Sequence, residues 1–184
     1  MTADEQTASE QTASEQPVSE QPDGPFLYYG FGSNLDADRL HIHCPSARLV
    51  TTARLADHRL AFSIESANTW HGGVADVRPV PGDEVWGALW VIDAGHSRPL
   101  DAQEGLFRDP PAYERITVEV TTPTGDVVTC RSYRVARPDP DGFAPSPAYL
   151  DTLLRGARAI ALPAAYIARL EAIEHNGYDG AGPH

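Results

Sequence analysis

Six stretches between residues 47 and 135 are rich in β-branched and aromatic residues, which favour pleated sheets. They read ARLVTTARL, HRLAFSI, GGVADVRPV, EVWGALWVI, ERITVEVTT and DVVTCRSYRV. Between them lie turn signals such as Pro81-Gly82-Asp83 and Thr124-Gly125-Asp126. Strands joined directly by short turns pair antiparallel. We therefore predict a mostly antiparallel sheet in which the last two stretches form a hairpin.

Helical patterns surround these strands. A short apolar run that starts at Phe26 is followed by a glycine turn and then by LDADRLHIH, which predicts a short amphipathic helix. The chain closes with PAYLDTLLRGARAIAL and PAAYIARLEAI, two amphipathic patterns with Pro163 in the first turn of the second. The predicted fold is a single α+β domain, with a curved, mostly antiparallel sheet or small β-barrel flanked by helices.

The segment SRPLDAQEG predicts one more helix. Ser97 can cap it, Pro99 is tolerated in its first turn, and Gly105 can end it. Glu104 then lies at the C-terminal end, where the helix dipole is negative. Burial by Leu100 and Leu106 would raise the pKa of this carboxyl group toward that of a general base, although a surface acid fits the pattern as well.

The N-terminal region has a different composition. Residues 7–21 read TASEQ, TASEQ, PVSEQ, with almost nothing apolar to bury, so we predict a disordered acidic tail over residues 1–24. The folded domain is predicted over 25–178, with a flexible C-terminus at 179–184. The tail carries six acidic and no basic residues, which leaves about −6 of the formal net charge of −12 for the rest of the chain.

Composition excludes several classes of protein. All 14 basic residues are arginine, so Schiff-base chemistry, a P-loop lysine and a lysine general base are absent. The net negative charge argues against nucleic acid as a partner. We expect no membrane association, because no apolar stretch approaches about 18 residues and no secretory signal is evident. Two cysteines without CxxC spacing favour a reducing, cytoplasmic location.

Metal and nucleophile patterns are weak. His41, His43 and Cys44 lie close in sequence, but an H-x-H-C run has neither helical nor zinc-finger spacing, so we expect no metal site. Ser33 lacks the GxSxG context of a nucleophile elbow. Its turn, Gly30–Leu35, follows an apolar strand and can direct backbone N–H groups at an anion or oxyanion. By itself the same pattern also fits a plain tight turn, and it is not GxGxxG.

Taken together, these segments resemble the γ-glutamylcyclotransferase family over nearly the whole chain beyond the tail. FLYYGFGSNL is similar to the family's N-terminal YGSNL substrate loop, and LDAQEG to the segment that carries its catalytic glutamate. PGDEVWGALWVI, TCRSYRV and APSPAYLDTLLRGARAIALPAAYIARLEAI match the strands and C-terminal helices in order. The resemblance is strongest to the cytosolic animal-type enzymes and weaker to the glutathione-specific branch.

The resemblance implies conversion of γ-glutamyl amino acids to 5-oxoproline and a free amino acid, without metal or cofactor. It assigns Glu104 as the catalytic acid and base. Substrate contacts are implied for the loop and for the tyrosine of the PSPxY segment, which are Tyr28, Tyr29, Gly30, Phe31, Gly32, Ser33, Asn34 and Tyr149. It also makes a homodimer an expectation.

Two departures from the family pattern bear on the pocket. Phe31 stands where the loop usually has tyrosine, so one hydroxyl is missing. The segment LFRDPPAY is longer than usual and should reshape the rim near Tyr113. The alternatives are the same cyclisation on a dedicated γ-glutamyl amine or biosynthetic intermediate, hydrolysis that releases glutamate, and a non-catalytic binding module.

Overall fold

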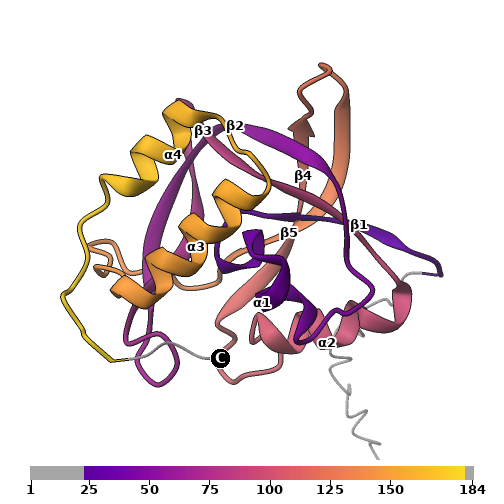
Figure 1. Cartoon of the computed structure of the whole chain (residues 1–184). Coiled ribbons are helices and arrows are strands. Elements are labelled where there is room, and N and C mark those ends of the chain that lie inside the picture. Colours follow the sequence, from indigo (N-terminus) through magenta and orange to yellow (C-terminus); the bar gives the residue numbers. More distant parts are fainter. Residues whose placement is uncertain (1–22, 181–184) are drawn as a thin grey trace, which may run out of the picture.

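The computed structural model describes residues 23–180 and contains one α+β domain with a closed five-stranded barrel (Figure 1). The predicted 1–24 tail, apart from its last two residues, and residues 181–184 lie outside the described residues. Around the barrel the strand order is β1-β3-β2-β4-β5. The strands are β1 (Phe26–Gly30), β2 (Arg48–Ser66), β3 (Gly72–Ile92), β4 (Tyr113–Thr121) and β5 (Val127–Val135). The expected fold class is confirmed.

The middle of the sheet differs from the prediction. Four of the predicted strands are merged into two, because β2 and β3 run for 19 and 21 residues as one long antiparallel hairpin. The Pro81-Gly82-Asp83 signal is therefore not a chain reversal. Gly82 (φ 80°) lies opposite Asp57 (φ 55°), whose Oδ1 accepts a hydrogen bond of 2.8 Å from the Gly82 N–H. The register shifts between Ala56 and His58, so the turn residues mark a bulge that bends the hairpin.

The barrel closes through the short strand β1. It pairs antiparallel with β3 along its whole length and parallel with β5 at Tyr28 and Arg131. The Ser132 hydroxyl donates to the Tyr29 carbonyl across the same junction. The β4–β5 hairpin forms as predicted, with Tyr113 opposite Val135. Closure removes the exposed edges that an open sheet of these strands would leave.

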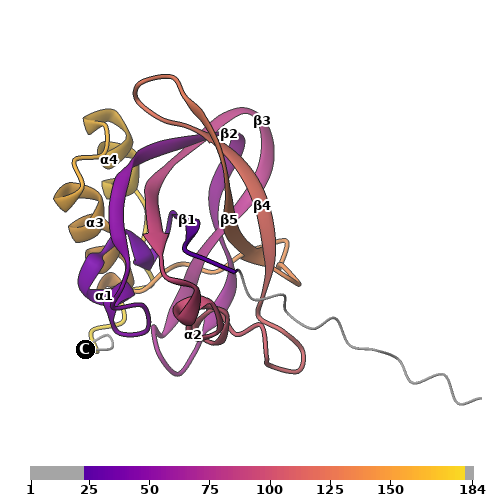
Figure 2. The ribbon, with the colours of Figure 1, turned by 90° about the vertical axis from the view of Figure 1, so that its right-hand side faces the viewer.

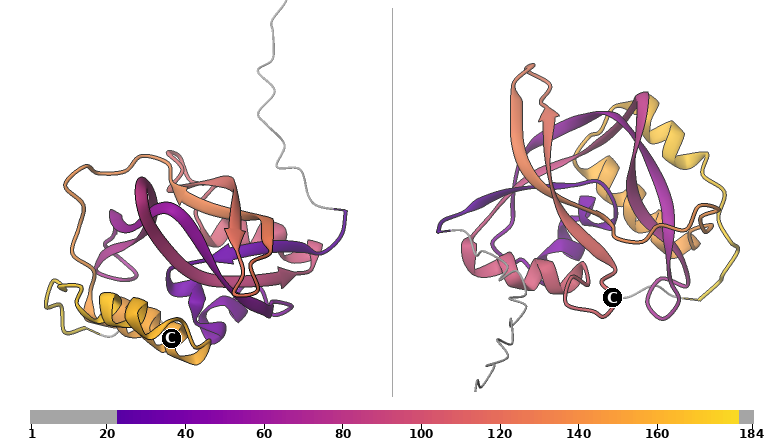
Figure 3. Two further views of the ribbon diagram at one scale, coloured as in Figure 1. Left: turned by 90° about the horizontal axis from the view of Figure 1, so that it is seen from above. Right: turned by 180° about the vertical axis from the view of Figure 1, so that it is seen from behind.

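Four helices pack around the barrel (Figures 1 and 2). They are α1 (Ala37–His41), α2 (Ser97–Gln103), α3 (Pro147–Ala159) and α4 (Ala164–Glu171). The pair α3 and α4 covers one side, whereas α1 and α2 lie at one end (Figure 3). In the described residues no helix is long and apolar enough to span a bilayer.

Two helix starts differ from the prediction. Ser97 does not cap α2, because its hydroxyl accepts a hydrogen bond of 2.8 Å from Arg131 Nη1, and a short 3-10 turn (Ala94–His96) leads into the helix instead. Pro163 precedes α4 rather than lying inside its first turn. The predicted end of α2 is confirmed, since Gly105 adopts φ 71°, which favours glycine.

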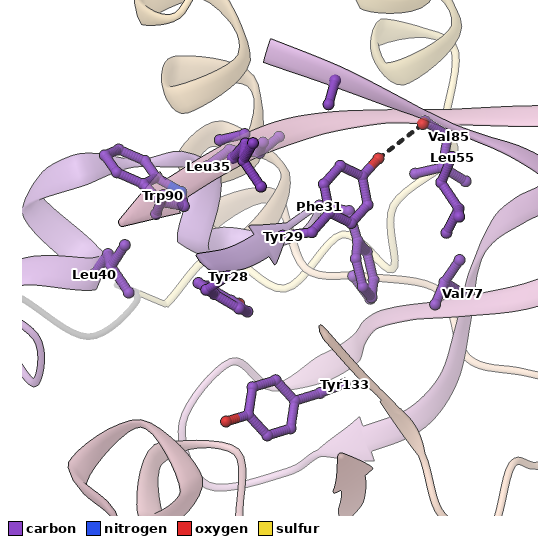
Figure 4. Packing of buried hydrophobic residues seen from close by; sticks show 14 of the residues in the cluster. Tyr28, Tyr29, Phe31, Leu35, Leu40, Leu55, Val77, Val85, Trp90 and Tyr133 are labelled. Atoms are coloured by element: carbon purple, nitrogen blue, oxygen red, sulfur yellow. Dashed lines mark hydrogen bonds between the residues drawn. The ribbon is translucent and has the colours of Figure 1, made fainter. Parts of the chain in front are cut away.

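Apolar and aromatic side chains fill the barrel and the space beneath the helices (Figure 4). Tyr28 and Tyr29 show how β1 sends neighbouring side chains to two different parts of the core. Successive side chains of a strand point to opposite faces. Tyr28 faces Tyr133, with ring centroids 5.9 Å apart, whereas the fully buried Tyr29 turns away and donates a hydrogen bond of 2.8 Å to the Val85 carbonyl (Figure 4).

Candidate active site

A pocket of about 570 Å³ lies where the loop after β1, the end of α2 and the start of α3 meet. Its walls include most of the residues predicted from sequence, namely Tyr28, Phe31, Gly32, Ser33, Asn34, Glu104 and Tyr149. Residues from β2, β3, β4 and β5 complete it. Segments up to about 120 residues apart thus meet around one concavity.

The loop that forms one wall is fixed by close packing. It continues from β1 into a 3-10 turn, η1 (Ser33–Leu35), and then into α1, which Asp36 caps by accepting from the Arg39 N–H. A side chain at Gly32 would meet the Tyr149 hydroxyl at 2.9 Å and the Ala75 Cβ at 2.8 Å, so only glycine fits without displacing them. The loop backbone is therefore held in place at the pocket wall.

Behind the loop, α3 supplies the support. Gly156 lies so close to η1 that a Cβ there would collide with the Asp36 nitrogen and the Leu35 carbonyl carbon. The Ser146 hydroxyl caps the helix by accepting from the Tyr149 N–H. This cap sets the first turn of α3, from which Tyr149 enters the pocket.

Two predicted substrate contacts do not line the pocket. Tyr29 is fully buried on the opposite face of β1, and its hydroxyl donates a hydrogen bond to the Val85 carbonyl. Gly30 is also absent from the pocket walls, and its carbonyl instead approaches Gly87 of β3. We therefore assign both residues to packing: the pleat of β1 directs Tyr28 to the pocket and Tyr29 away from it, and Gly30 lies against β3.

Glu104 ends α2 and is held by a chain of amide hydrogen bonds. Its Oε1 accepts from Asn34 Nδ2 at 2.9 Å, and the same amide nitrogen donates to the Tyr28 hydroxyl at 2.9 Å. Gln103 Nε2 donates to Asn34 Oδ1 at 2.7 Å. This last bond orients the Asn34 side chain, so that its NH₂ group rather than its oxygen faces Glu104.

The chemistry of Glu104 follows from these surroundings. Burial is the largest influence and raises the pKa of its carboxyl group to about 7, while the hydrogen bond from Asn34 and the charge of Arg39 act in the opposite direction. The sequence left open whether Glu104 is buried, and the structure places it in surroundings that raise its pKa. A carboxyl group with a pKa near neutrality exchanges protons readily in both directions, which is what a general acid and base requires.

Three tyrosines complete the walls. The Tyr149 hydroxyl accepts from the Ala75 N–H at 2.9 Å, and the Tyr113 hydroxyl donates to the Ala75 carbonyl at 2.6 Å. The Tyr133 hydroxyl donates to Asp101 Oδ1 at 2.7 Å. Burial raises the pKa of Tyr149 to about 12, so this hydroxyl keeps its proton near neutrality. The tyrosines thus offer neutral polar groups and aromatic surface.

Several wall residues escaped the sequence reasoning, among them Arg39, Trp70 and Gln103. Arg39 and Trp70 were not singled out at all, and Gln103 was passed over beside Glu104. The available signal for Gln103 was its position, because a residue next to a helix-end acid shares its surroundings. The signal for Arg39 was weaker. Arg39 lies four residues before His43, a spacing that places two side chains on one face of a helix, and both line the pocket.

The sequence cluster of metal-capable residues does not form a centre. The His41 ring bonds to the Ala47 carbonyl at 2.9 Å, and Cys44 is buried. Over residues 23–180, no group of three His, Cys, Asp or Glu side chains is placed to hold a metal ion. Burial also raises the pKa of the Cys44 thiol to about 12, so it is not a reactive thiolate.

Comparison with known proteins gives a consistent answer. Residues 84–170 match the model of the AIG2-like family. A human γ-glutamylcyclotransferase is 40% identical over 158 residues, which cover 84% of this chain and 82% of the human one, and a mouse γ-glutamylcyclotransferase is 39% identical over the same shares. A solved γ-glutamyl cyclotransferase superposes with a TM-score of 0.82 at 39% identity, over 87% of this chain and 94% of that one. The chain therefore belongs to the γ-glutamylcyclotransferase family.

Proposed function

We propose that this enzyme converts γ-glutamyl amino acids to 5-oxoproline and the free amino acid, with Glu104 moving the protons. The observation that carries the proposal is Glu104 itself, a carboxyl group with a pKa near 7 that lines the pocket beside a glycine loop. The curated relatives named γ-glutamylcyclotransferase support the same reaction.

Ring closure begins at the α-nitrogen of the substrate. A free α-amine titrates at about 7.7 to 8.0, so near neutrality most of it is an ammonium ion that cannot attack. The ionised carboxylate of Glu104 accepts one proton. The α-nitrogen then attacks the γ-carbonyl carbon of the same glutamyl group. Because nucleophile and electrophile belong to one molecule, folding the substrate back can supply about 7 to 11 kcal/mol of the barrier reduction.

Collapse of the tetrahedral intermediate completes the reaction. The loop backbone donates to the developing oxyanion. The carboxylic acid of Glu104 protonates the leaving nitrogen as the C–N bond breaks. The carboxylate formed in this way then takes the second excess proton from the ring nitrogen and passes it to the released amine. Overall, two protons pass from the α-nitrogen to the leaving amine, Glu104 returns to its starting state, and no water is consumed.

The test compares wild type with Glu104→Gln, which keeps the shape of the side chain and removes its acid–base function. Both are incubated with γ-glutamyl-alanine, a panel of other γ-glutamyl amino acids and glutathione, and products are identified by mass. We expect 5-oxoproline from the dipeptides with wild type and almost none with the variant. Glu119→Gln, an exposed residue on β4, is the matched control.

Other products would contradict the proposal. Free glutamate would indicate hydrolysis by water, and wild-type-like turnover by Glu104→Gln would remove Glu104 as the base. Turnover restricted to γ-glutamyl amines would favour the same cyclisation on a dedicated amine. Binding without turnover of any member of the panel would favour a non-catalytic module.

We further propose a cytoplasmic homodimer. Both cysteines, Cys44 and Cys130, are free and buried, which fits a reducing compartment. Light scattering on the purified protein tests the dimer: a mass near 40 kDa supports it, since the chain weighs 19.9 kDa, and the mass of one chain refutes it.

A further inference from the structure

Arg39 lies in the pocket with a hydrogen-bonding group that the protein does not use. Its Nε atom is buried and has no partner among the described residues. Its guanidinium carbon lies 5.7 Å from the centre of the Trp70 ring, so the guanidinium makes a cation–π contact with that ring. A buried donor without an acceptor costs free energy, which a ligand with the right acceptor recovers.

Arg39 is positively charged near neutral pH. Burial lowers the pKa of Arg39 and the nearby Glu104 raises it, but a guanidinium remains protonated throughout the neutral range. His43, one turn further along the chain, has its pKa lowered by partial desolvation and by the charge of Arg39. Near neutrality His43 is therefore mostly uncharged, so of these two neighbours Arg39 is the one that carries a fixed positive charge.

A planar guanidinium with free N–H groups can donate two parallel hydrogen bonds to a carboxylate. The substrate offers two carboxylates. One is on the glutamyl half, beside the attacking amine, and the other is on the leaving amino acid. The glutamyl half has to fold into a ring against the loop wall, next to Gly32 and Tyr149. The leaving half then extends away from that wall.

The arrangement of the second wall favours the leaving half. Arg39 and His43 both line the pocket with Glu104. Arg39 is half-buried and His43 is exposed, so this wall leads from Glu104 out to solvent. Glu104 has to reach the leaving nitrogen to protonate it, and Arg39 lines the same pocket as Glu104. The guanidinium can therefore bind a carboxylate one carbon from the leaving nitrogen.

We propose that Arg39 binds the carboxylate of the leaving amino acid and thereby selects γ-glutamyl amino acids over γ-glutamyl amines. This inference rests on the cyclotransferase function proposed above. It assigns to one side chain the choice of leaving group, and it makes Arg39 a specificity-determining residue rather than a group that moves protons.

The experiment uses two substrates that differ by one carboxylate, γ-glutamyl-alanine and γ-glutamyl-ethylamide. Release of 5-oxoproline is measured with wild type, Arg39→Gln, Arg39→Lys and Arg48→Gln. Arg48 is an exposed residue of β2 outside the pocket and controls for the loss of one positive charge. Removing Arg39 raises the pKa of the Glu104 carboxyl group. The assays are therefore run at about pH 9, where Glu104 is ionised in every variant.

We expect wild type to prefer γ-glutamyl-alanine by about 10- to 100-fold in kcat/KM, as for one charge-assisted hydrogen-bonded contact. Arg39→Gln loses this preference, mainly through a higher KM for γ-glutamyl-alanine. Arg39→Lys retains part of it, and Arg48→Gln retains all of it. Thermal melting confirms that each variant is folded.

Three results would overturn the inference. Equal losses of Arg39→Gln on both substrates would place the glutamyl carboxylate, or the catalytic step, at Arg39. An unchanged preference in Arg39→Gln would remove the contact altogether. A wild type that forms 5-oxoproline from both substrates at equal rates would show that the leaving carboxylate is not read. Failure of the proposed function gives a different result, because wild type would then form no 5-oxoproline from either substrate.

Discussion

Two carboxyl groups in this protein, the fully buried Asp76 and the partly buried Glu104, have opposite surroundings. Asp76 lies fully buried in β3, where Oδ1 accepts from the N–H groups of Val77 and Val135 at 2.8 and 2.9 Å. Its Oδ2 accepts from the Ser63 hydroxyl at 2.5 Å and lies 3.7 Å from Arg78. Glu104 accepts one hydrogen bond from a protein side chain, that of Asn34.

The difference shows how a buried acid becomes structural or reactive. Donors from β3, β5 and β2 surround Asp76, so it ties three strands of the barrel together and has no free face for a substrate. Glu104 is left with unfilled acceptor sites toward the pocket, and burial without full compensation raises its pKa. The number of donors, together with access to the pocket, distinguishes the two roles.

The largest effect is expected from Glu104→Gln. Loss of a general acid and base costs about 10²- to 10⁴-fold, so kcat/KM for γ-glutamyl-alanine should fall by about 10³-fold. Steady-state kinetics check this, with circular dichroism to show that the fold is kept. A fall of less than tenfold would mean that Glu104 is not the general acid and base and is, like Asp76, a structural residue.

Asp76→Ala should act on stability. It leaves two N–H groups and a hydroxyl without their acceptor inside the barrel, which costs about 3 kcal/mol or more in the free energy of unfolding. Urea denaturation measures the loss. Asp83→Ala removes a carboxylate from ion pairs with the more exposed Arg59 and Arg169, and it should cost less than about 1 kcal/mol. Equal losses at the two sites would contradict the structural role of Asp76.

Glu104→Gln should stabilise the protein at alkaline pH. The pKa of Glu104 is about 7 in the folded protein against 4.5 in the unfolded chain, so the folded state binds the proton more tightly. Stability contributed by this group therefore falls as pH rises from about 4.5 through 7. We expect the variant to exceed wild type by about 1 to 2 kcal/mol at pH 8 and to equal it at pH 4. A constant difference across pH would refute the raised pKa.

Asn34→Ala sharpens the comparison from the donor side. Wild-type kcat/KM should rise with pH through about 7 as Glu104 ionises. Removing the donor on Oε1 raises the pKa of Glu104 further, so the rising limb should move to higher pH by about 0.5 to 1 unit. The pH profile of kcat/KM measures the shift. Gln103→Ala should move it in the same direction by less, because Gln103 acts only by orienting Asn34. A shift to lower pH in Asn34→Ala would contradict the assignment.

Much of the site was predictable because it depends on local pattern. The turn after β1, the stop of α2 before Gly105 and the position of Glu104 at the end of that helix are set by residues that are neighbours in sequence. The long hairpin was not predictable in the same way. Pro81-Gly82-Asp83 fits a reversal or a bulge equally, and only pairing with the strand around Asp57 decides between them.

The sequence by itself determined the local elements, the loop rich in glycine and the acid at a helix end, since these follow from backbone preferences and side-chain spacing. Only the tertiary structure decided which of Tyr28 and Tyr29 faces the pocket, because both satisfy the same alternating pattern. It also brought Asn34 to Glu104 across 70 residues and Ala75 to Tyr149 across 74. The pKa of Glu104 depends on burial and on donors supplied by distant segments, and these exist only once the barrel has closed.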